Sequence, residues 1–219
     1  MEIQEYINTL YIEHKYLDDI QKNILNYAKK EKIPFLSPVK VKILSSLIKI
    51  KRPEKVLEIG LGSGFSTYSI LKSMNGNGEL VSIDFNFFRV EYFFENIFKK
   101  LDNNLKRCLV VYPLDIFYVV KIYREIEKKF DFIFLDATKK DYLFLLPELE
   151  NLLNVNGVLL CDNITYSEQT FRSVTDRSKN YLKGIEFLDE FNKRLLKTQS
   201  FYTSYIPVED GMSLSVKIY

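Results

Sequence analysis

Two hydrophobic patterns succeed one another along this chain. Residues 1 to about 33 carry apolar side chains at helical spacing, and the prolines of IPFLSP end that pattern. A further helix is predicted over 39–50. Short apolar runs then recur between longer segments, and each run predicts a buried strand. These runs are KVLEIG (55–60), ELVSID (79–84), CLVVY (108–112), DFIFLD (131–136) and GVLLCD (157–162).

The segments between these runs are long enough for helices, which predicts strand-helix-strand crossovers and a mostly parallel sheet. A last helix is expected around 180–197. The final runs, SFYTSYIP and MSLSVKIY, are joined by VEDG and predict an antiparallel hairpin. We therefore expect an α/β fold with helices on both faces of the sheet. No linker or repeat interrupts the pattern, so one domain is predicted over 1–219, with an N-terminal helical arm (1–38) and a core (39–219).

Composition narrows the possible chemistry. The 219 residues are 47% hydrophobic, which is typical of a globular domain. Only Cys108, Cys161 and a single histidine, His14, are present, so disulfide scaffolds, multi-histidine zinc sites and Ser-His-Asp hydrolases are excluded. A net charge of +2 produces no strong electrostatic field that would attract nucleic acid or an anionic membrane. Without a signal peptide or a long apolar span, we expect a soluble, cytoplasmic protein.

A glycine-rich loop follows the first predicted strand. Alternate glycines let the backbone turn tightly and approach a ligand closely. The second strand ends at Asp84, 24 positions after Gly60, near the spacing of about 20 expected for a carboxylate that binds ribose hydroxyls. A nucleotide-like ligand is predicted, although a purely structural turn and an N-cap role for Asp84 stay open. The candidate cofactor-binding residues of the loop are Glu58, Gly60, Gly62, Gly64 and Ser66.

A nicotinamide cofactor is a remote alternative. The dinucleotide-binding pattern GxGxxG would need glycine at position 65, where this chain has Phe65. An oxidoreductase is therefore disfavoured, and binding of NADH followed by fluorescence would test it.

Polar residues also follow the fourth and fifth predicted strands, namely Asp136 and the pair Asp162-Asn163. If these strands are neighbours, about 4.8 Å apart, the three side chains can converge. Two carboxylates and an amide oxygen suit Mg²⁺, or another divalent cation such as Mn²⁺ or Ca²⁺. Helix capping is the alternative, because Asp and Asn are common at strand-to-helix junctions. Lys139 and Lys140 follow closely, and one of them would face the metal unless both are solvated.

Five motifs occur in a characteristic order: VLEIGLGSGFS, VSIDFN, FDFIFLDATKKDY, LLCDNI and IPVEDGMSLSVK. Together they resemble the cation-dependent O-methyltransferase family, which includes catechol and caffeoyl-CoA O-methyltransferases and bacterial relatives. The similarity extends from about residue 33 to 219. It implies the Rossmann-like class I methyltransferase fold, with seven strands of which the last is antiparallel, and S-adenosylmethionine as cofactor. A catalytically idle binding module is disfavoured, because the metal set and Lys139 are all present.

The resemblance also implies how the cofactor is bound. Gly60 and Ser66 would hold its methionine end, and Asp84 would bind its ribose hydroxyls. Asp115 and Ile116 would border the adenine.

The second half of the chain matches the family's catalytic motif. Asp136, Asp162 and Asn163 correspond to its metal ligands, and Asp136 is also expected to border the cofactor. Lys139 corresponds to the catalytic lysine, and Tyr142 to the tyrosine of the same motif. In this mechanism Lys139 would remove the proton of a chelated hydroxyl or stabilise its oxyanion, which then attacks the sulfonium methyl group.

Two parts of the sequence depart from the family pattern. The stretch 36–43 aligns with one that usually carries a Gly-Gln pair, and here Val41 and Lys42 stand there, so cofactor contacts from this stretch are not implied. Thr138 occupies a position that is often Asp in bacterial relatives and Trp in the catechol enzyme. Catechol itself is therefore not implied as the substrate.

Two classes of methyl acceptor are compatible with the motifs. One is a small aromatic or enediol-like hydroxyl compound. The other is 5-hydroxyuridine at the tRNA wobble position, since YAKKEKIPFLSP and EFNKRLL are similar to a bacterial branch that methylates it. Basic side chains would then contact phosphates, unless they are ordinary solvated charges. They are Lys22, Lys29, Lys30, Lys32, Arg172, Arg177, Lys179 and Lys183. Family members are often dimers, and a homodimer is expected.

Overall fold

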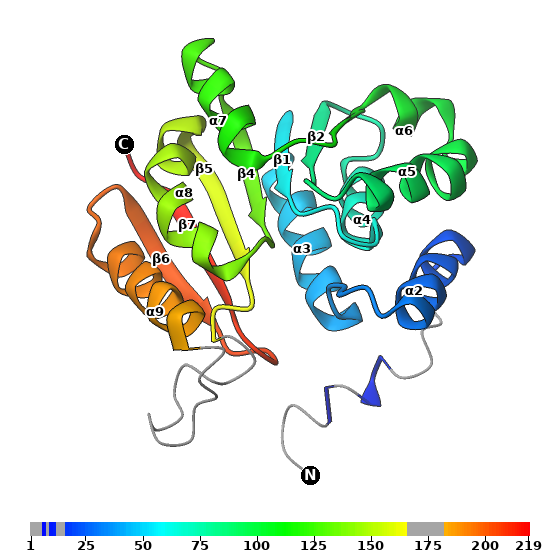
Figure 1. The fold of residues 1–219 in the computed structure, drawn as a ribbon, viewed down its shortest axis with the longest axis horizontal. Coiled ribbons are helices and arrows are strands. Elements are labelled where there is room, and N and C mark those ends of the chain that lie inside the picture. Colours follow the sequence, from blue (N-terminus) through cyan, green and yellow to red (C-terminus); the bar gives the residue numbers. More distant parts are fainter. Residues whose placement is uncertain (1–5, 8, 12–15, 166–181) are drawn as a thin grey trace. The chain divides into compact units, whose positions relative to one another are not determined.

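The computed structural model describes residues 6, 7, 9–11, 16–165 and 182–219. His14 lies outside these ranges, as do Arg172, Arg177 and Lys179, three of the basic residues considered as phosphate contacts. The chain divides into two compact units, Met1–Ile116 and Phe117–Tyr219. In Figure 1 the first unit is coloured from blue to green and the second from green to red.

The first unit contains a parallel sheet in which β2 lies between β1 and β3. Val81 of β2 pairs with Leu57 of β1 on one side and with Val110 of β3 on the other. β1 and β2 are buried along most of their length, as expected for a parallel sheet covered by helices, whereas β3 is half-buried. The elements are α2 (Asp19–Glu31), α3 (Pro38–Lys51), β1 (Lys55–Ile59), α4 (Phe65–Met74), β2 (Glu79–Ile83), α5 (Phe87–Asn96), the 3-10 helix η1 (Phe98–Lys100), α6 (Asn103–Arg107) and β3 (Leu109–Tyr112).

Local sequence explains where the N-terminal helices begin. Asp18 and Gln21 form a reciprocal capping box at the start of α2, with hydrogen bonds of 2.8 Å and 3.2 Å. Ser37 caps α3, and Pro38 occupies its first position, where no backbone donor is needed. The predicted helices of the arm and of residues 39–50 are thus confirmed within the described residues.

The segment between β2 and β3 contains three short helices rather than one long crossover helix. The chain becomes extended at Leu101 (φ −71°, ψ 149°), between η1 and α6. The Leu101 side chain is buried, and Asp102 follows it as the N-cap residue of α6.

The second unit contains a mixed sheet. β5 pairs in parallel with β4 and antiparallel with β7, and β6 pairs antiparallel with β7. Helix α8 packs on β4 and β5, and α9 packs on α8 and β6. The elements are α7 (Ile116–Glu125), β4 (Phe130–Leu135), α8 (Lys139–Leu152), β5 (Leu153–Asp162), α9 (Leu182–Lys197), β6 (Phe201–Ile206) and β7 (Met212–Lys217).

The seven predicted strands are all present, including the closing antiparallel hairpin (Figure 1). β5 begins at Leu153, four residues before the predicted run. Its first part alternates apolar and polar residues and is largely exposed after Leu153, and the register with β4 shifts there. Asn154 donates a hydrogen bond to Asp131 Oδ1 at 2.8 Å, and Asn156 adopts a left-handed conformation (φ 62°). Hydrophobic pattern alone does not mark such a segment as a strand.

Among the helices within the described ranges, none is long and apolar enough to cross a bilayer.

Candidate functional site

The loop after β1 is built on glycines with positive φ. The φ angles of Gly60, Gly62 and Gly64 are 103°, 56° and 83°. A Cβ atom at position 64 would lie 2.5 Å from a ring carbon of Phe93, so a larger residue there would clash with the core. Gly64 is also the N-cap residue of α4. The loop conformation therefore requires glycine for both backbone and packing reasons.

Asp84 lies directly against this loop. Its Oδ2 accepts a hydrogen bond from the backbone N–H of Gly62 at 2.9 Å, and its Oδ1 accepts one from the N–H of Asn86, also at 2.9 Å. Asn86, not Asp84, is the N-cap residue of α5. The carboxylate is nearly buried and ties the end of β2 to the glycine loop. The structure thus brings together the two motifs from which a nucleotide-like ligand was predicted.

The other predicted residues of the first unit differ in accessibility. Glu58 is fully buried and accepts hydrogen bonds from Thr67 Oγ1 at 2.5 Å and from Ser82 Oγ at 2.6 Å. These bonds join β1, α4 and β2 next to the glycine loop. Glu58 thus holds these three elements together, a role that the sequence did not indicate. Ser66 is buried in the first turn of α4, and Asp115 is exposed beside the buried Ile116.

The ends of β4 and β5 carry the predicted metal ligands of the second unit. Leu135 pairs with Cys161 in the parallel register, so Asp136 and Asp162 leave the sheet side by side at the same edge. The sequence analysis expected these side chains to converge only if the fourth and fifth strands are neighbours, and β4 and β5 are paired. Asn163 follows at φ 52°, a left-handed conformation that asparagine tolerates better than most residues.

Lys139 and Lys140 have different environments. Lys139 is the first residue of α8 and is buried, whereas Lys140 is exposed. The Lys139 Nζ donates to the backbone oxygen of Asp162 at 3.3 Å and lies 3.4 Å from Asp136 Oδ1. Of the two lysines, Lys139 therefore faces the Asp136 carboxylate and the backbone of Asp162.

The N-terminal end of α8 also bears on the capping alternative. Thr138 is the N-cap residue of this helix, so Asp136 does not cap it. The described part of the chain holds no group of three or more His, Cys, Asp or Glu side chains that could bind one metal ion. The predicted set is of another composition, two carboxylates and one amide oxygen, and its role stays a prediction.

The resemblance matched Tyr142 to the tyrosine of the family motif but assigned it no role, and the structure gives it one. Tyr142 is fully buried, and its hydroxyl accepts a hydrogen bond from Lys139 Nζ at 2.7 Å. The same hydroxyl lies 3.0 Å from the backbone oxygen of Leu135 and 2.9 Å from that of Asp162, to which it can donate. Burial, and then the negative charge of Asp136, raise the pKa of Tyr142 well above its usual value, so the hydroxyl stays protonated. The i, i+3 spacing from Lys139 was the available signal.

Replacing Tyr142 by phenylalanine is expected to lower the free energy of unfolding by about 1–3 kcal/mol, because a buried ammonium loses an acceptor. Urea denaturation at pH 7 measures this. Tyr202→Phe is the matched control, since the side chain of Tyr202 is 72% exposed and should contribute little. Equal unfolding free energies for the two variants would contradict the assigned role of the Tyr142 hydroxyl.

Comparison with known proteins relates this geometry to a family. The family model described as O-methyltransferase matches residues 7–218. A caffeoyl-CoA O-methyltransferase from Pinus taeda is 27% identical, and the match covers 80% of this chain and 68% of that protein. Tapetum-specific methyltransferase 1 from Arabidopsis thaliana is 26% identical over 78% of this chain and 72% of its own length.

Solved structures show the same fold over the whole chain. An O-methyltransferase from Bacillus cereus in complex with SAH superposes with a TM-score of 0.81 at 19% identity, covering 98% of this chain and 96% of that one. The O-methyltransferase TomG from Streptomyces achromogenes, in complex with SAM, gives 0.81 at 19% identity and covers both chains completely. The predicted class I methyltransferase fold is thus confirmed. Because the family model spans nearly the entire sequence, this chain belongs to the O-methyltransferase family, and the predicted enzyme class is confirmed.

Proposed function

We propose that this protein transfers a methyl group from S-adenosylmethionine to a hydroxyl of a small aromatic or enediol-like substrate, with the help of a divalent cation. The acceptor would carry two neighbouring oxygens. The observation that carries this proposal is the edge of the β4–β5 pair, where Asp136 and Asp162 lie side by side and Lys139 is held against them.

The donor set at this edge fits a divalent cation. Asp136 and Asp162 offer hard carboxylate oxygens and Asn163 an amide oxygen, the ligand types that Mg²⁺ prefers. When bound, such an ion would lower the pKa of an acceptor hydroxyl and fix its position. The side chain of Asp136 is 33% exposed, which leaves it accessible to an ion from solvent.

The glycine loop and Asp84 are the proposed cofactor site of the first unit. Positive-φ glycines present backbone without Cβ atoms, and the Asp84 carboxylate beside them would accept hydrogen bonds from ribose hydroxyls. The cofactor supplies the methyl group on a positively charged sulfur. That SAH and SAM are present in the two solved relatives supports this assignment.

Lys139 would act on the acceptor oxygen as a fixed positive charge. Its hydrogen bonds to Tyr142 and to the Asp162 backbone limit its motion, so it is preorganised to stabilise negative charge on that oxygen. The acceptor hydroxyl would first lose its proton to solvent, which leaves an oxyanion. In the transfer itself the C–S bond of the cofactor would break as the C–O bond forms. Opposite charges cancel in this step, which a dry and aligned site favours.

The chemistry of the site and the names of relatives both support a small acceptor. The caffeoyl group named in the Pinus taeda relative bears two adjacent phenolic oxygens, which supports an acceptor of this kind. A tRNA acceptor is the second candidate, and the exposed lysines of α2 are the observation in its favour. Two of them, Lys22 and Lys30, already pair with Asp19 and Glu31, which favours the small acceptor.

Labelled methyl transfer from S-adenosylmethionine distinguishes these acceptors. A panel of catechols and enediols is assayed beside tRNA that contains 5-hydroxyuridine, each with Mg²⁺ at low and high salt. We expect labelling of a small acceptor with little salt dependence. Labelling of tRNA alone, falling steeply with salt, would replace the small acceptor by RNA.

A further inference from the structure

The N-terminal helix α2 contacts the helices that follow both proposed cofactor motifs. α4 begins directly after the glycine loop, and α5 begins just after Asp84. α2 packs on α4 through its apolar face, where Ile24 and Ala28 are buried. None of the residues that make its polar contacts has a role in the proposed chemistry.

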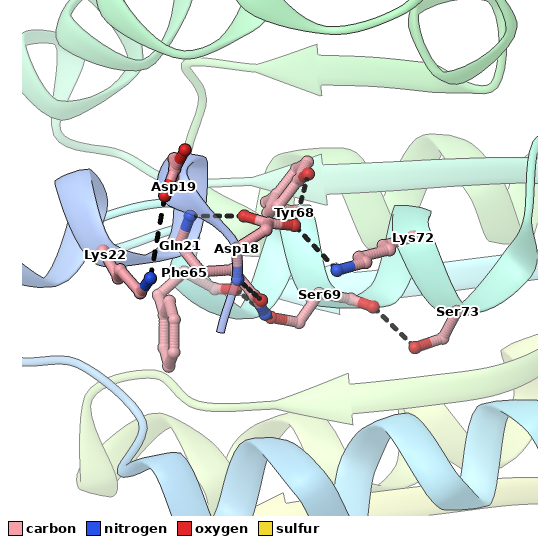
Figure 2. Close-up of polar contacts among 9 residues, drawn as sticks. All are labelled: Asp18, Asp19, Gln21, Lys22, Phe65, Tyr68, Ser69, Lys72 and Ser73. Carbon is pink, nitrogen blue, oxygen red and sulfur yellow. Dashed lines mark hydrogen bonds and ion pairs between the residues drawn. The ribbon is translucent and has the colours of Figure 1, made fainter. Parts of the chain in front are cut away.

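Polar contacts fasten the start of α2 to α4 (Figure 2). The Asp18 Oδ2 atom accepts hydrogen bonds from Tyr68 OH at 2.9 Å and from Lys72 Nζ at 2.7 Å. Gln21 Nε2 donates to Ser69 Oγ at 3.1 Å, and that hydroxyl donates to the backbone oxygen of Phe65 at 2.7 Å. Asp18 therefore caps its own helix through Oδ1 and holds α4 through Oδ2.

Two aromatic contacts extend the attachment to α3 and α5. Tyr27 stacks on Tyr92 of α5 with ring planes at 4°. On α3, the Lys42 ammonium lies 4.6 Å from the ring centre of Tyr16. Lys42 stands where the family pattern has a cofactor-contacting pair, and here it contacts the arm instead.

The segment after α2 reaches the glycine loop itself. A Cβ atom built on Gly62 would lie 3.4 Å from the backbone oxygen of Pro34, so the chain between α2 and α3 runs against this loop. Gly62 in turn donates to Asp84. A continuous series of contacts thus connects Asp18 with the residues proposed to bind the cofactor.

We propose that α2, held by Asp18, Gln21 and Tyr27, is a positioning element that fixes the glycine loop and the Asp84 turn in their cofactor-binding arrangement. This inference rests on the proposed function, because it takes S-adenosylmethionine as the ligand of that loop. The residues of α2 act through α4 and α5 and touch no cofactor. Docking of the arm and binding of the cofactor then stabilise each other, and the coupling is reciprocal.

The charge and hydrogen bonds at Asp18 make it the best residue to test. Burial alone would raise the pKa of Asp18, but the hydrogen bonds from Lys72, Gln21 and Tyr68 outweigh it and lower that pKa, which shows that the charged form is the one held. An asparagine has one acceptor oxygen and cannot replace both Oδ1 and Oδ2. Asp18→Asn should therefore lose either the cap or the attachment to α4.

Calorimetric titration with S-adenosylhomocysteine tests the proposal in the full-length protein. We expect Asp18→Asn to raise the dissociation constant about tenfold, within the range of typical coupling between sites. Asp19→Asn is the matched control, since Asp19 is the next residue and 96% exposed, with one ion pair to Lys22. Its dissociation constant should change less than about twofold, as expected for a surface pair. Tyr68→Phe, which keeps the cap and removes one donor, should weaken binding in the same direction as Asp18→Asn.

Hydrogen exchange separates positioning from general destabilisation. In the wild type, S-adenosylhomocysteine should slow exchange of the α2 amides (Asp19–Glu31), and this protection should shrink in Tyr68→Phe. Unchanged affinity in both Asp18→Asn and Tyr68→Phe, or α2 exchange that is indifferent to the ligand, would overturn the inference while leaving the cofactor site intact. Failure of the wild type to bind S-adenosylhomocysteine would refute the proposed cofactor and this inference together.

Discussion

Replacing Asp162 by alanine is expected to abolish methyl transfer while leaving cofactor binding nearly unchanged. The substitution removes a buried carboxylate from the proposed cation site and retains the backbone oxygen that holds Lys139 and Tyr142. A bound cation contributes several kcal/mol to stabilising charge in the transition state, so the rate should fall by about 10³-fold or more. Turnover under saturating Mg²⁺ measures the loss, and titration with S-adenosylhomocysteine measures the retained affinity.

Asp189→Ala is the control for Asp162→Ala. Asp189 belongs to the same unit, lies on α9 with a 46% exposed side chain, and pairs with Lys193 on the surface. Its turnover should match the wild type. Equal turnover in Asp162→Ala and the wild type would rule out the cation-binding role of this carboxylate.

Replacing Asp84 by alanine should weaken binding of S-adenosylhomocysteine by about 100-fold. Hydrogen bonds to a charged group contribute about 1.5–3 kcal/mol, and the carboxylate also holds the Gly62 N–H of the loop. Calorimetry gives the dissociation constant, and thermal unfolding without ligand reports any loss of the loop's own stability.

Glu91→Ala is the companion variant for Asp84→Ala. Glu91 is an exposed carboxylate on α5 in the same unit, so its loss should leave the dissociation constant within about twofold. A dissociation constant in Asp84→Ala equal to that of the wild type would reject the assignment of Asp84 to the ribose.

The parts of the fold that the sequence predicts well are those with strong periodicity. The apolar runs from KVLEIG to GVLLCD are all strands, because a buried parallel strand needs apolar residues on both faces. The start of β5 was missed, since Asn154 and Asn156 lie where the strand is half exposed and irregular. The break at Leu101 between η1 and α6 places a buried side chain between two helices, which the apolar periodicity does not mark.

The candidate site likewise has parts that the sequence predicts and parts that depend on tertiary packing. Spacing placed Asp84 beside the glycine loop and put Asp136 and Asp162 at one edge, since strand ends in a parallel sheet share an edge. From the residues alone the choice between Lys139 and Lys140 stayed open, and the family motif implied Lys139. The structure buries Lys139 in the first turn of α8 and leaves Lys140 exposed. The attachment of Asp18 to Lys72 joins residues 54 positions apart and has no local signature.

Cation dependence is measured as methyl transfer to the small acceptor with the highest turnover, by wild-type protein stripped with EDTA and then supplied with Mg²⁺. We expect negligible transfer after EDTA, recovery of full activity on addition of Mg²⁺, and unchanged binding of S-adenosylhomocysteine throughout. Full activity in EDTA, with cofactor bound and no metal detected by elemental analysis, would contradict cation-dependent transfer at Asp136, Asp162 and Asn163.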